Sequence, residues 1–218
     1  MPPLLEVKNL TKSFTYKKGI FKKERFYVFK NLNFSVEFKS IFGIAGKTGA
    51  GKSTLAKIIA GLLPFDEGDV NWNPDFIKNI KKDVKYIPQN PLASLNPRLK
   101  IKELLTEPLR VWYKNQKSEW TDIMKKSLEK VNLPLEILDS YPFQLSGGQR
   151  QRVCLALALE CDPKVLICDE IISFLDLNLQ VQILKLLKNL NETFNLTIIL
   201  ISHNIQILNS FCDKIFSL

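Results

Sequence analysis

The stretch Gly46–Thr54 constrains this 218-residue chain more than any other part of its sequence. It matches the pattern G-x-x-x-x-G-K-[ST], in which glycines let consecutive backbone N–H groups turn toward an anion and a lysine adds positive charge. The apolar run Ile41–Ala45 precedes it as a predicted buried strand, and Leu55, Ile58 and Leu62 follow at helical spacing. A strand, a glycine loop and a helix in this order predict a binding site for nucleotide phosphates.

Two side chains of this loop have specific expected roles. We expect Lys52 to bind the β- and γ-phosphates of ATP and the hydroxyl group of Ser53 to ligate Mg²⁺. A glycine loop without a ligand is the alternative, and the flanking strand and helix argue against it. The loop residues expected to contact the nucleotide are Gly46, Lys47, Thr48, Gly49, Ala50, Gly51, Lys52, Ser53 and Thr54.

Two acidic residues, Asp169 and Glu170, follow a second apolar run, Val165–Cys168. Such a run is typical of a parallel strand covered on both faces, and open α/β sheets place their ligands at the carboxyl ends of such strands. We expect Asp169 to hold Mg²⁺, directly or through water, and Glu170 to orient and polarise an attacking water molecule. A solvated strand end or a helix cap is the less favoured alternative beside a phosphate loop.

The only histidine of the chain, His203, closes a third apolar run, Leu196–Ser202. A lone histidine is usually structural. At the end of a strand that is expected near the phosphate loop, a hydrogen bond from His203 to the γ-phosphate is the favoured interpretation.

A predicted helix begins at Ser146, which forms the capping box S-x-x-Q with Gln149. Gly147 and Gly148 leave the first-turn amides open to an external anion, although a simple capped helix is the alternative. A second copy of the chain, arranged head to tail, would bring this helix start to a γ-phosphate bound by the loop at Gly46–Thr54.

In this order, the motifs resemble those of the nucleotide-binding subunit of an ATP-binding cassette (ABC) transporter, over nearly the whole chain. The matching segments are Gly46–Thr54 as Walker A, Gln89 as the Q-loop glutamine, Leu145–Gln149 as the signature, Val165–Glu170 as Walker B, Asp176 as the D-loop aspartate and His203 as the switch histidine. The resemblance implies ATP and Mg²⁺ as cofactors. It implies metal contacts from Ser53, Gln89 and Asp169, and nucleotide contacts from Ser146, Gly148, Gln149 and Asp176.

The same resemblance implies partners and a location. Two ATP molecules would lie between two ATPase subunits, which form a homodimer or a heterodimer, and closure on ATP would drive transmembrane permease subunits. A narrower resemblance, within Pro88–Arg98 and at Glu107–Leu109, is to the ATPase subunits of oligopeptide, dipeptide and nickel importers. It implies an indirect partner, a substrate-binding protein, and a peripheral position on the cytoplasmic face of the inner or plasma membrane.

Several positions depart from the family pattern. Ile171 and Ile172 stand where Pro-Thr usually follows Walker B, and Asn204 stands where Asp usually follows the switch histidine. These departures keep open a nucleotide-binding module with little hydrolysis, although Glu170 and His203 argue against it. A soluble ABC ATPase that acts on nucleic acid or ribosomes is a further alternative, but such proteins usually fuse two cassettes or insert a long coiled coil.

For the adenine ring, the resemblance implies an aromatic side chain near the first strands. Phe14 is the first expectation, Tyr16 the second and Tyr27 a third. Packing in the core or on the surface is the alternative for each of them.

Length and patterning predict one α/β domain over residues 1–218. We expect a P-loop NTPase core over 41–89 and 146–218, which would form a mostly parallel sheet with flanking helices. We expect an antiparallel β-subdomain over 4–40 and a helical subdomain over 90–145.

No apolar run approaches the roughly 18 residues of a membrane span. Four cysteines without C-x-x-C spacing predict a reducing compartment with neither disulfides nor zinc. The net charge of +9 suits ATP, anionic lipid headgroups or nucleic acid, but no nucleic-acid partner is expected because the sequence resembles no known nucleic-acid-binding module.

Overall fold

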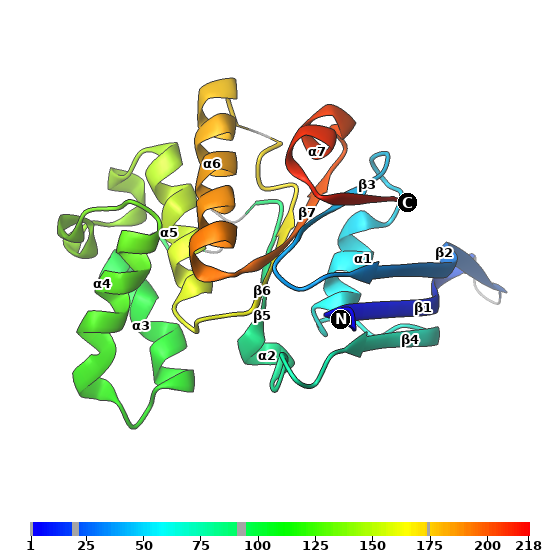
Figure 1. Ribbon diagram of the computed structural model, residues 1–218, viewed down its shortest axis with the longest axis horizontal. Helices are drawn as coiled ribbons and strands as arrows, with labels where there is room; N and C mark the ends of the chain where they lie inside the picture. Colours follow the sequence, from blue (N-terminus) through cyan, green and yellow to red (C-terminus); the bar gives the residue numbers. More distant parts are fainter. Residues whose placement is uncertain (1, 19–21, 91–94, 174) are drawn as a thin grey trace.

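A five-stranded parallel sheet forms the centre of the computed structural model, which describes residues 2–18, 22–90, 95–173 and 175–218 (Figure 1). Its strand order is β5-β6-β7-β3-β8. The strands span Val84–Ile87 (β5), Val165–Asp169 (β6), Thr197–Ser202 (β7), Ile41–Ala45 (β3) and Lys214–Ser217 (β8). Strands β3, β6 and β7 are buried over their full length, as expected for apolar runs that are covered on both faces.

The register of this sheet brings the ends of three strands together. Ala45 of β3 pairs with Ser202 of β7, and Asp169 of β6 pairs with Ile201 of β7. Because the strands are parallel, the residues that follow them leave the sheet at one edge. The predicted phosphate loop, Glu170 and His203 therefore start from neighbouring points.

A second, antiparallel sheet has the strand order β2-β1-β4. Its strands span Leu5–Lys18 (β1), Lys22–Val36 (β2) and Glu67–Trp72 (β4). The predicted antiparallel subdomain over 4–40 therefore does not include β4, because β4 lies within residues 41–89, which the sequence analysis assigned to the P-loop core. The pairing of β1 with β2 extends to Lys18↔Lys22, and residues 19–21 lie outside the described ranges.

Helices cover the parallel sheet and extend to one end of the molecule (Figure 1). The α-helices span Lys52–Ile59 (α1), Ile80–Asp83 (α2), Ile101–Trp112 (α3), Trp120–Lys130 (α4), Gly147–Leu159 (α5), Leu177–Phe194 (α6) and Ile205–Phe211 (α7). Short 3₁₀ turns span Lys117–Glu119 (η2), Leu135–Asp139 (η3) and Pro142–Gln144 (η4). Within the described ranges, none of the helices is long and apolar enough to cross a membrane.

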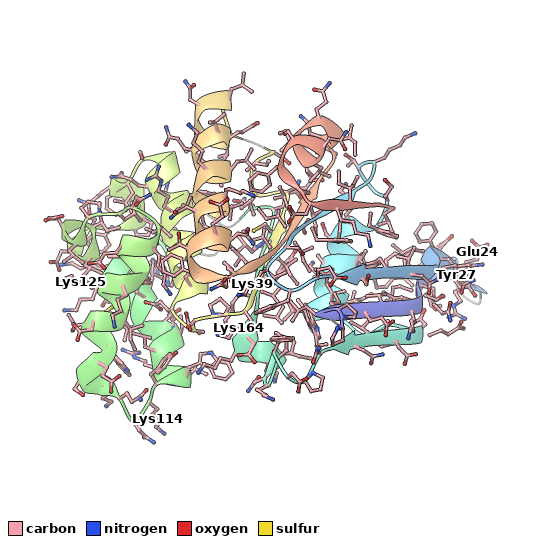
Figure 2. All side chains as sticks on the ribbon, in the orientation of Figure 1. Glu24, Tyr27, Lys39, Lys114, Lys125 and Lys164 are labelled. Atoms are coloured by element: carbon pink, nitrogen blue, oxygen red, sulfur yellow. The ribbon has the colours of Figure 1, made fainter. Side chains whose placement is uncertain are left out.

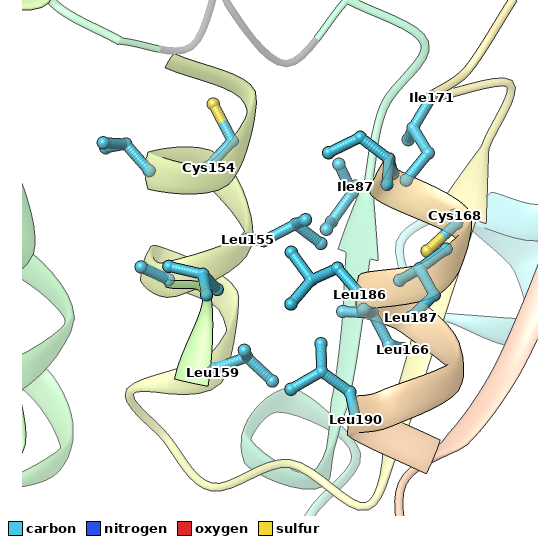
Figure 3. Packing of buried hydrophobic residues seen from close by; sticks show 14 of the residues in the cluster. Ile87, Cys154, Leu155, Leu159, Leu166, Cys168, Ile171, Leu186, Leu187 and Leu190 are labelled. Carbon is cyan, nitrogen blue, oxygen red and sulfur yellow. The ribbon is translucent and has the colours of Figure 1, made fainter. Parts of the chain in front are cut away.

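Alternate residues of the parallel strands pack into two separate cores. Leu166 and Cys168 of β6 face a core that α3, α4, α5 and α6 share, whereas Val165 and Ile167 face α1 and the antiparallel sheet. Figure 3 shows part of the first core, in which Leu187 of α6 lies against the strand side chains. This period-2 alternation is what a strand buried on both faces requires.

We predict that Leu187→Ala lowers the free energy of unfolding by about 2–5 kcal/mol, because Leu187 is fully buried and its truncation leaves a cavity. Leu177→Ala in the same helix is the matched control, because Leu177 is 78% exposed, and should change stability by less than about 0.5 kcal/mol. Urea unfolding followed by circular dichroism measures both. Equal effects of the two substitutions would contradict the packing described here.

Candidate functional site

The loop between β3 and α1 has the backbone that the glycine pattern predicts. Gly51 is the N-cap of α1 with φ 97°, and Gly49 has φ 84°, both in the left-handed region that favours glycine. A Cβ atom on Gly51 would overlap Cγ1 of Val28, whereas one on Gly49 would meet nothing within 4 Å. Because Gly51 has no side chain with which to cap α1, the first-turn N–H groups of this helix remain available to an anion.

Lys52 is the buried cation of the site, with 5% of its surface exposed. Its Nζ donates hydrogen bonds to the carbonyl oxygens of Gly46 (2.9 Å) and Lys47 (3.1 Å). It also lies 3.1 Å from Oε1 of Glu170 in an ion pair. These three acceptors hold the ammonium group over the loop, and they balance the cost of burying its charge.

Glu170 connects the loop to the histidine. Its Oε2 accepts a hydrogen bond from Ser173 Oγ (3.0 Å) and lies 3.1 Å from His203 Nδ1. Burial raises the pKa of this carboxyl group, but hydrogen bonds from Lys52, His203 and Ser173 outweigh burial and lower the pKa below its usual value. Glu170 is therefore ionised at neutral pH. Its φ of 49° is strained for a residue with a side chain, a feature that clusters at functional sites.

Asp169 lies one residue before Glu170 and is almost completely buried. Its Oδ2 accepts a hydrogen bond from the Tyr86 hydroxyl group (2.8 Å), while Oδ1 is buried with no hydrogen-bond partner in the described part of the chain. Burial, followed by this hydrogen bond, raises the pKa of Tyr86, so the hydroxyl group remains a donor. The free Oδ1 fits a metal ion or its hydration shell. No group of three or more His, Cys, Asp or Glu in the described ranges could hold a metal without other ligands.

A cavity of about 700 Å³ brings most of the predicted residues together. Its lining comes from the phosphate loop, the first hairpin and the ends of three strands. The lining residues are Phe14, Phe26, Val28, Thr48, Gly49, Gly51, Lys52, Ser53, Thr54, Gln89, Glu170, Ser173 and His203.

Among the three aromatic candidates for adenine, only Phe14 lines this cavity. Tyr16 donates a hydrogen bond to Glu24, and the ring of Tyr27 lies under the charged groups of Arg25 and Lys30. Figure 2 shows Glu24 and Tyr27 toward the far end of the β1–β2 hairpin.

Sequence reasoning missed three lining residues, Phe26, Val28 and Ser173. Phe26 is the cross-strand partner of Phe14, so the two rings border the cavity from adjacent strands. The place of Phe26 in the hairpin was the one signal that it could lie near the cavity. However, the residue that faces Phe26 depends on the register of β1 and β2, and this register contains shifts that the sequence does not reveal. Ser173 lies three residues after Glu170, a spacing that in a turn brings two side chains together.

The glycine-rich helix start lies elsewhere in the same chain. Ser146 is the N-cap of α5: its Oγ accepts from Gln149 N (3.2 Å), and its own N–H donates to Gln149 Oε1 (2.9 Å), which forms the predicted capping box. Ser146, Gly148 and Gln149 line a separate cavity of about 500 Å³. Asp176 caps α6, where its Oδ1 accepts from Leu179 N (3.0 Å), and is not among the residues that line either cavity.

The positions that depart from the family pattern have structural partners. Ile171 and Ile172 are buried in the core that α3, α4, α5 and α6 share, and the Ile171 carbonyl oxygen accepts a hydrogen bond from Gln151 Nε2 (3.2 Å). Asn204 caps α7, because its Oδ1 accepts from Gln206 N and Ile207 N. None of these three residues is among those that line the large cavity.

Comparison with known proteins identifies the family. The ABC transporter family profile matches residues 29–173. The chain is 36% identical to the oligopeptide transport ATP-binding protein OppF of Haemophilus influenzae, over 97% of this chain and 68% of that protein. It is 34% identical to the nickel import ATP-binding protein NikE of Shigella boydii, over 97% of this chain and 82% of that protein.

Among solved structures, the chain resembles a dimer of the ATP-binding cassette MJ0796 in a post-hydrolysis state bound to ADP and Pi. The TM-score is 0.79 at 31% identity, over 98% of this chain and 94% of that one. The chain therefore belongs to the ABC transporter family. The predicted family and the predicted α/β fold class are both confirmed.

We predict that Gly51→Ala lowers the free energy of unfolding by about 1–3 kcal/mol and weakens ATP binding at least about tenfold, because the new methyl group meets Val28 in a left-handed backbone. Gly147→Ala is the control for stability, since a Cβ there has nothing within 4 Å. Thermal unfolding and titration with a fluorescent ATP analogue measure the two effects. Wild-type values for Gly51→Ala would contradict the described loop geometry.

Proposed function

We propose that this chain is the ATP-binding and ATP-hydrolysing subunit of an ABC importer for peptides or nickel. One observation carries the proposal: Glu170 lies 3.1 Å from Lys52 through one carboxylate oxygen and 3.1 Å from His203 through the other, and all three residues line the cavity at the phosphate loop. This arrangement combines a phosphate-binding cation, an ionised general base and a polar group for the terminal phosphate.

Nucleotide binding rests on the loop and the hairpin. The N–H groups at Gly49, Gly51 and the start of α1 would donate to phosphate oxygens, and Lys52 would exchange its contact with Glu170 for the β- and γ-phosphates. Phe14 and Phe26, 45% and 58% exposed, offer aromatic surface for the adenine ring.

Mg²⁺ fits the same site if the nucleotide completes its coordination. The Ser53 hydroxyl group, the unpartnered Oδ1 of Asp169 and the Gln89 amide oxygen are the oxygen donors that this ion prefers. When bound, Mg²⁺ would neutralise negative charge on the phosphates. The Tyr86 hydrogen bond would hold the Asp169 carboxylate in one orientation.

Glu170 would act as the base that orients the attacking water. Its lowered pKa keeps the carboxylate ionised at neutral pH, so that it can accept a hydrogen bond from water. Ser173 and His203 hold one of its oxygens, and release of Lys52 to the phosphates would free the other. The second ring nitrogen of His203, Nε2, remains available for the γ-phosphate.

A second ATPase subunit would complete the site. Ser146, Gly148 and Gln149 line a different cavity from the phosphate loop of their own chain, which is the arrangement expected if they face a partner's nucleotide. The similarity to a dimeric ATP-binding cassette supports this proposal. Asp176, at the start of α6 and close in sequence to Glu170, would take part in the same interface.

The transport role rests on the relatives. OppF and NikE are named for oligopeptide transport and nickel import, so peptides and nickel are the cargo classes proposed here. Permease subunits, and through them a substrate-binding protein, would be the partners at the cytoplasmic face of the membrane. The importer-like segment after Gln89 includes residues 91–94, which lie outside the described ranges.

We predict that Glu170→Gln lowers phosphate release from Mg-ATP by a factor of about 10²–10⁴, while ATP binding stays within a few-fold of wild type. The amide keeps the shape of the side chain but cannot act as a base. Glu136→Gln, at an exposed position on η3, is the control and should keep wild-type turnover. Wild-type phosphate release from the Glu170→Gln protein would refute the assignment of Glu170 as the base that orients the attacking water.

A further inference from the structure

One carboxyl group, that of Asp66, contacts three side chains of the hairpin that carries Phe14. Asp66 lies one residue before β4, and β1 runs between β4 and β2 in the antiparallel sheet (Figure 1). Its backbone N–H donates a hydrogen bond to the carbonyl oxygen of Thr11 on β1 (3.0 Å), which holds Asp66 against this strand. Asp66 is not among the residues that line the nucleotide cavity, so it would act on a nucleotide through other residues.

Ser13 is held by Asp66 through two hydrogen bonds. Oδ2 of Asp66 accepts from the backbone N–H of Ser13 (2.7 Å) and from its hydroxyl group (2.6 Å). The Ser13 oxygen in turn accepts from Arg25 Nε (2.6 Å), and Nη2 of Arg25 lies 3.3 Å from Oδ2 of Asp66. Ser13 directly precedes Phe14 on β1. Arg25 directly precedes Phe26, which pairs with Phe14. One carboxylate therefore joins β1 to β2 next to the two rings that line the cavity.

Lys12 connects the same carboxylate to the ring of Phe14. Its Nζ lies 3.5 Å from Oδ1 of Asp66, and it lies over the Phe14 ring at 5.0 Å from the ring centre. An ammonium group over an aromatic face is attracted by the ring. Lys12 and Ser13 are each 7% exposed, whereas Phe14 is 45% exposed. Because Lys12 occupies one face of the ring, the opposite face is the one left for adenine.

The strand pairing is irregular at this point. The register of β1 against β2 shifts between Lys12 and Ser13, directly before Phe14. A slip of one residue in register moves side chains to the other face of a sheet, so a slip here would turn Phe14 away from the cavity. Asp66 contacts both Lys12 and Ser13, one on each side of the shift, and these contacts oppose such a slip.

The contacts also keep Asp66 charged. The hydrogen bond from the Ser13 hydroxyl group is the largest cause of a pKa lowered to about 2, and the Ser13 backbone, Arg25 and Lys12 add to it and outweigh burial. Asp66 is therefore a carboxylate at pH 7. Its side chain is 24% exposed, so its hold on the hairpin comes from several contacts to one group rather than from a single ion pair.

We propose that Asp66 is a positioning residue for the base of the nucleotide: it holds Ser13 and Lys12 so that the ring of Phe14 is fixed against adenine. This inference rests on the proposed function, in which Phe14 contacts the adenine ring. Lys52 has its own contacts to Gly46 and Glu170, so binding of the phosphates should not depend on Asp66.

We predict that Asp66→Ala weakens binding of magnesium AMP-PNP, a non-hydrolysable ATP analogue, by at least about threefold, and leaves binding of magnesium tripolyphosphate within about twofold of wild type. Tripolyphosphate has the phosphate chain without a base, so only AMP-PNP reports on the ring of Phe14. Isothermal titration calorimetry of the whole chain measures both affinities. Asp69→Ala, at an exposed position on β4, is the matched control and should leave both unchanged.

A double substitution tests whether Asp66 acts through Phe14. Phe14→Ala alone should weaken AMP-PNP binding about tenfold, because it removes stacking on the base. Adding Asp66→Ala to Phe14→Ala should then change the affinity by less than about twofold, since effects that pass through one residue do not add. In steady-state phosphate release, Asp66→Ala should raise KM for ATP with kcat unchanged, as expected when ground state and transition state lose the same binding.

Asp66→Asn keeps the shape of the side chain and removes its charge, so it provides a milder second variant, whose AMP-PNP affinity should fall in the same direction. Four results would overturn the proposal and leave the ATPase function intact. They are an unchanged AMP-PNP affinity of Asp66→Ala, an equal loss for tripolyphosphate, an equal effect of Asp66→Ala with and without Phe14, and an unchanged affinity of Phe14→Ala. Wild-type protein that binds neither probe would overturn both this proposal and the proposed ATPase function.

Discussion

The contact between Lys52 and Glu170 is the interaction on which the rest of the site depends. It joins the loop after β3 to the end of β6, and His203 adds the end of β7. The parallel sheet makes this possible, because its register places the three strand ends at one edge. The buried ammonium and carboxylate groups stabilise each other. When a nucleotide binds, Lys52 would exchange its contact with Glu170 for contacts with the phosphates.

Sequence reasoning located most of the nucleotide cavity because its signals are local. The glycine loop, the acidic pair after Val165–Cys168 and the histidine after Leu196–Ser202 each follow a short apolar run, which predicts a buried strand. Sequence reasoning also placed His203 near the loop, and the order of β6, β7 and β3 brings it there. Local pattern and sheet topology therefore agree at this edge.

The features that escaped prediction depend on tertiary packing. Strand β4 is largely exposed and carries only Val70 and Trp72 as apolar residues, so it has no clear alternating pattern. Phe26 reaches the cavity through a hairpin register that contains bulges. Glu160 follows Leu159 in an ordinary helical sequence, yet it is 3% exposed, and it lines a cavity together with residues of η2 and α4.

The most direct test of the account is the affinity for Mg-ATP of wild type and of Lys52→Met, measured by titration with a fluorescent analogue. Methionine keeps the length of the side chain and removes the charge. A buried charged contact to phosphate accounts for about 2–5 kcal/mol when one partner is truncated, so we expect a loss of affinity of more than tenfold. Equal affinities, with both proteins folded, would contradict the claim that the loop at Lys52 binds the triphosphate.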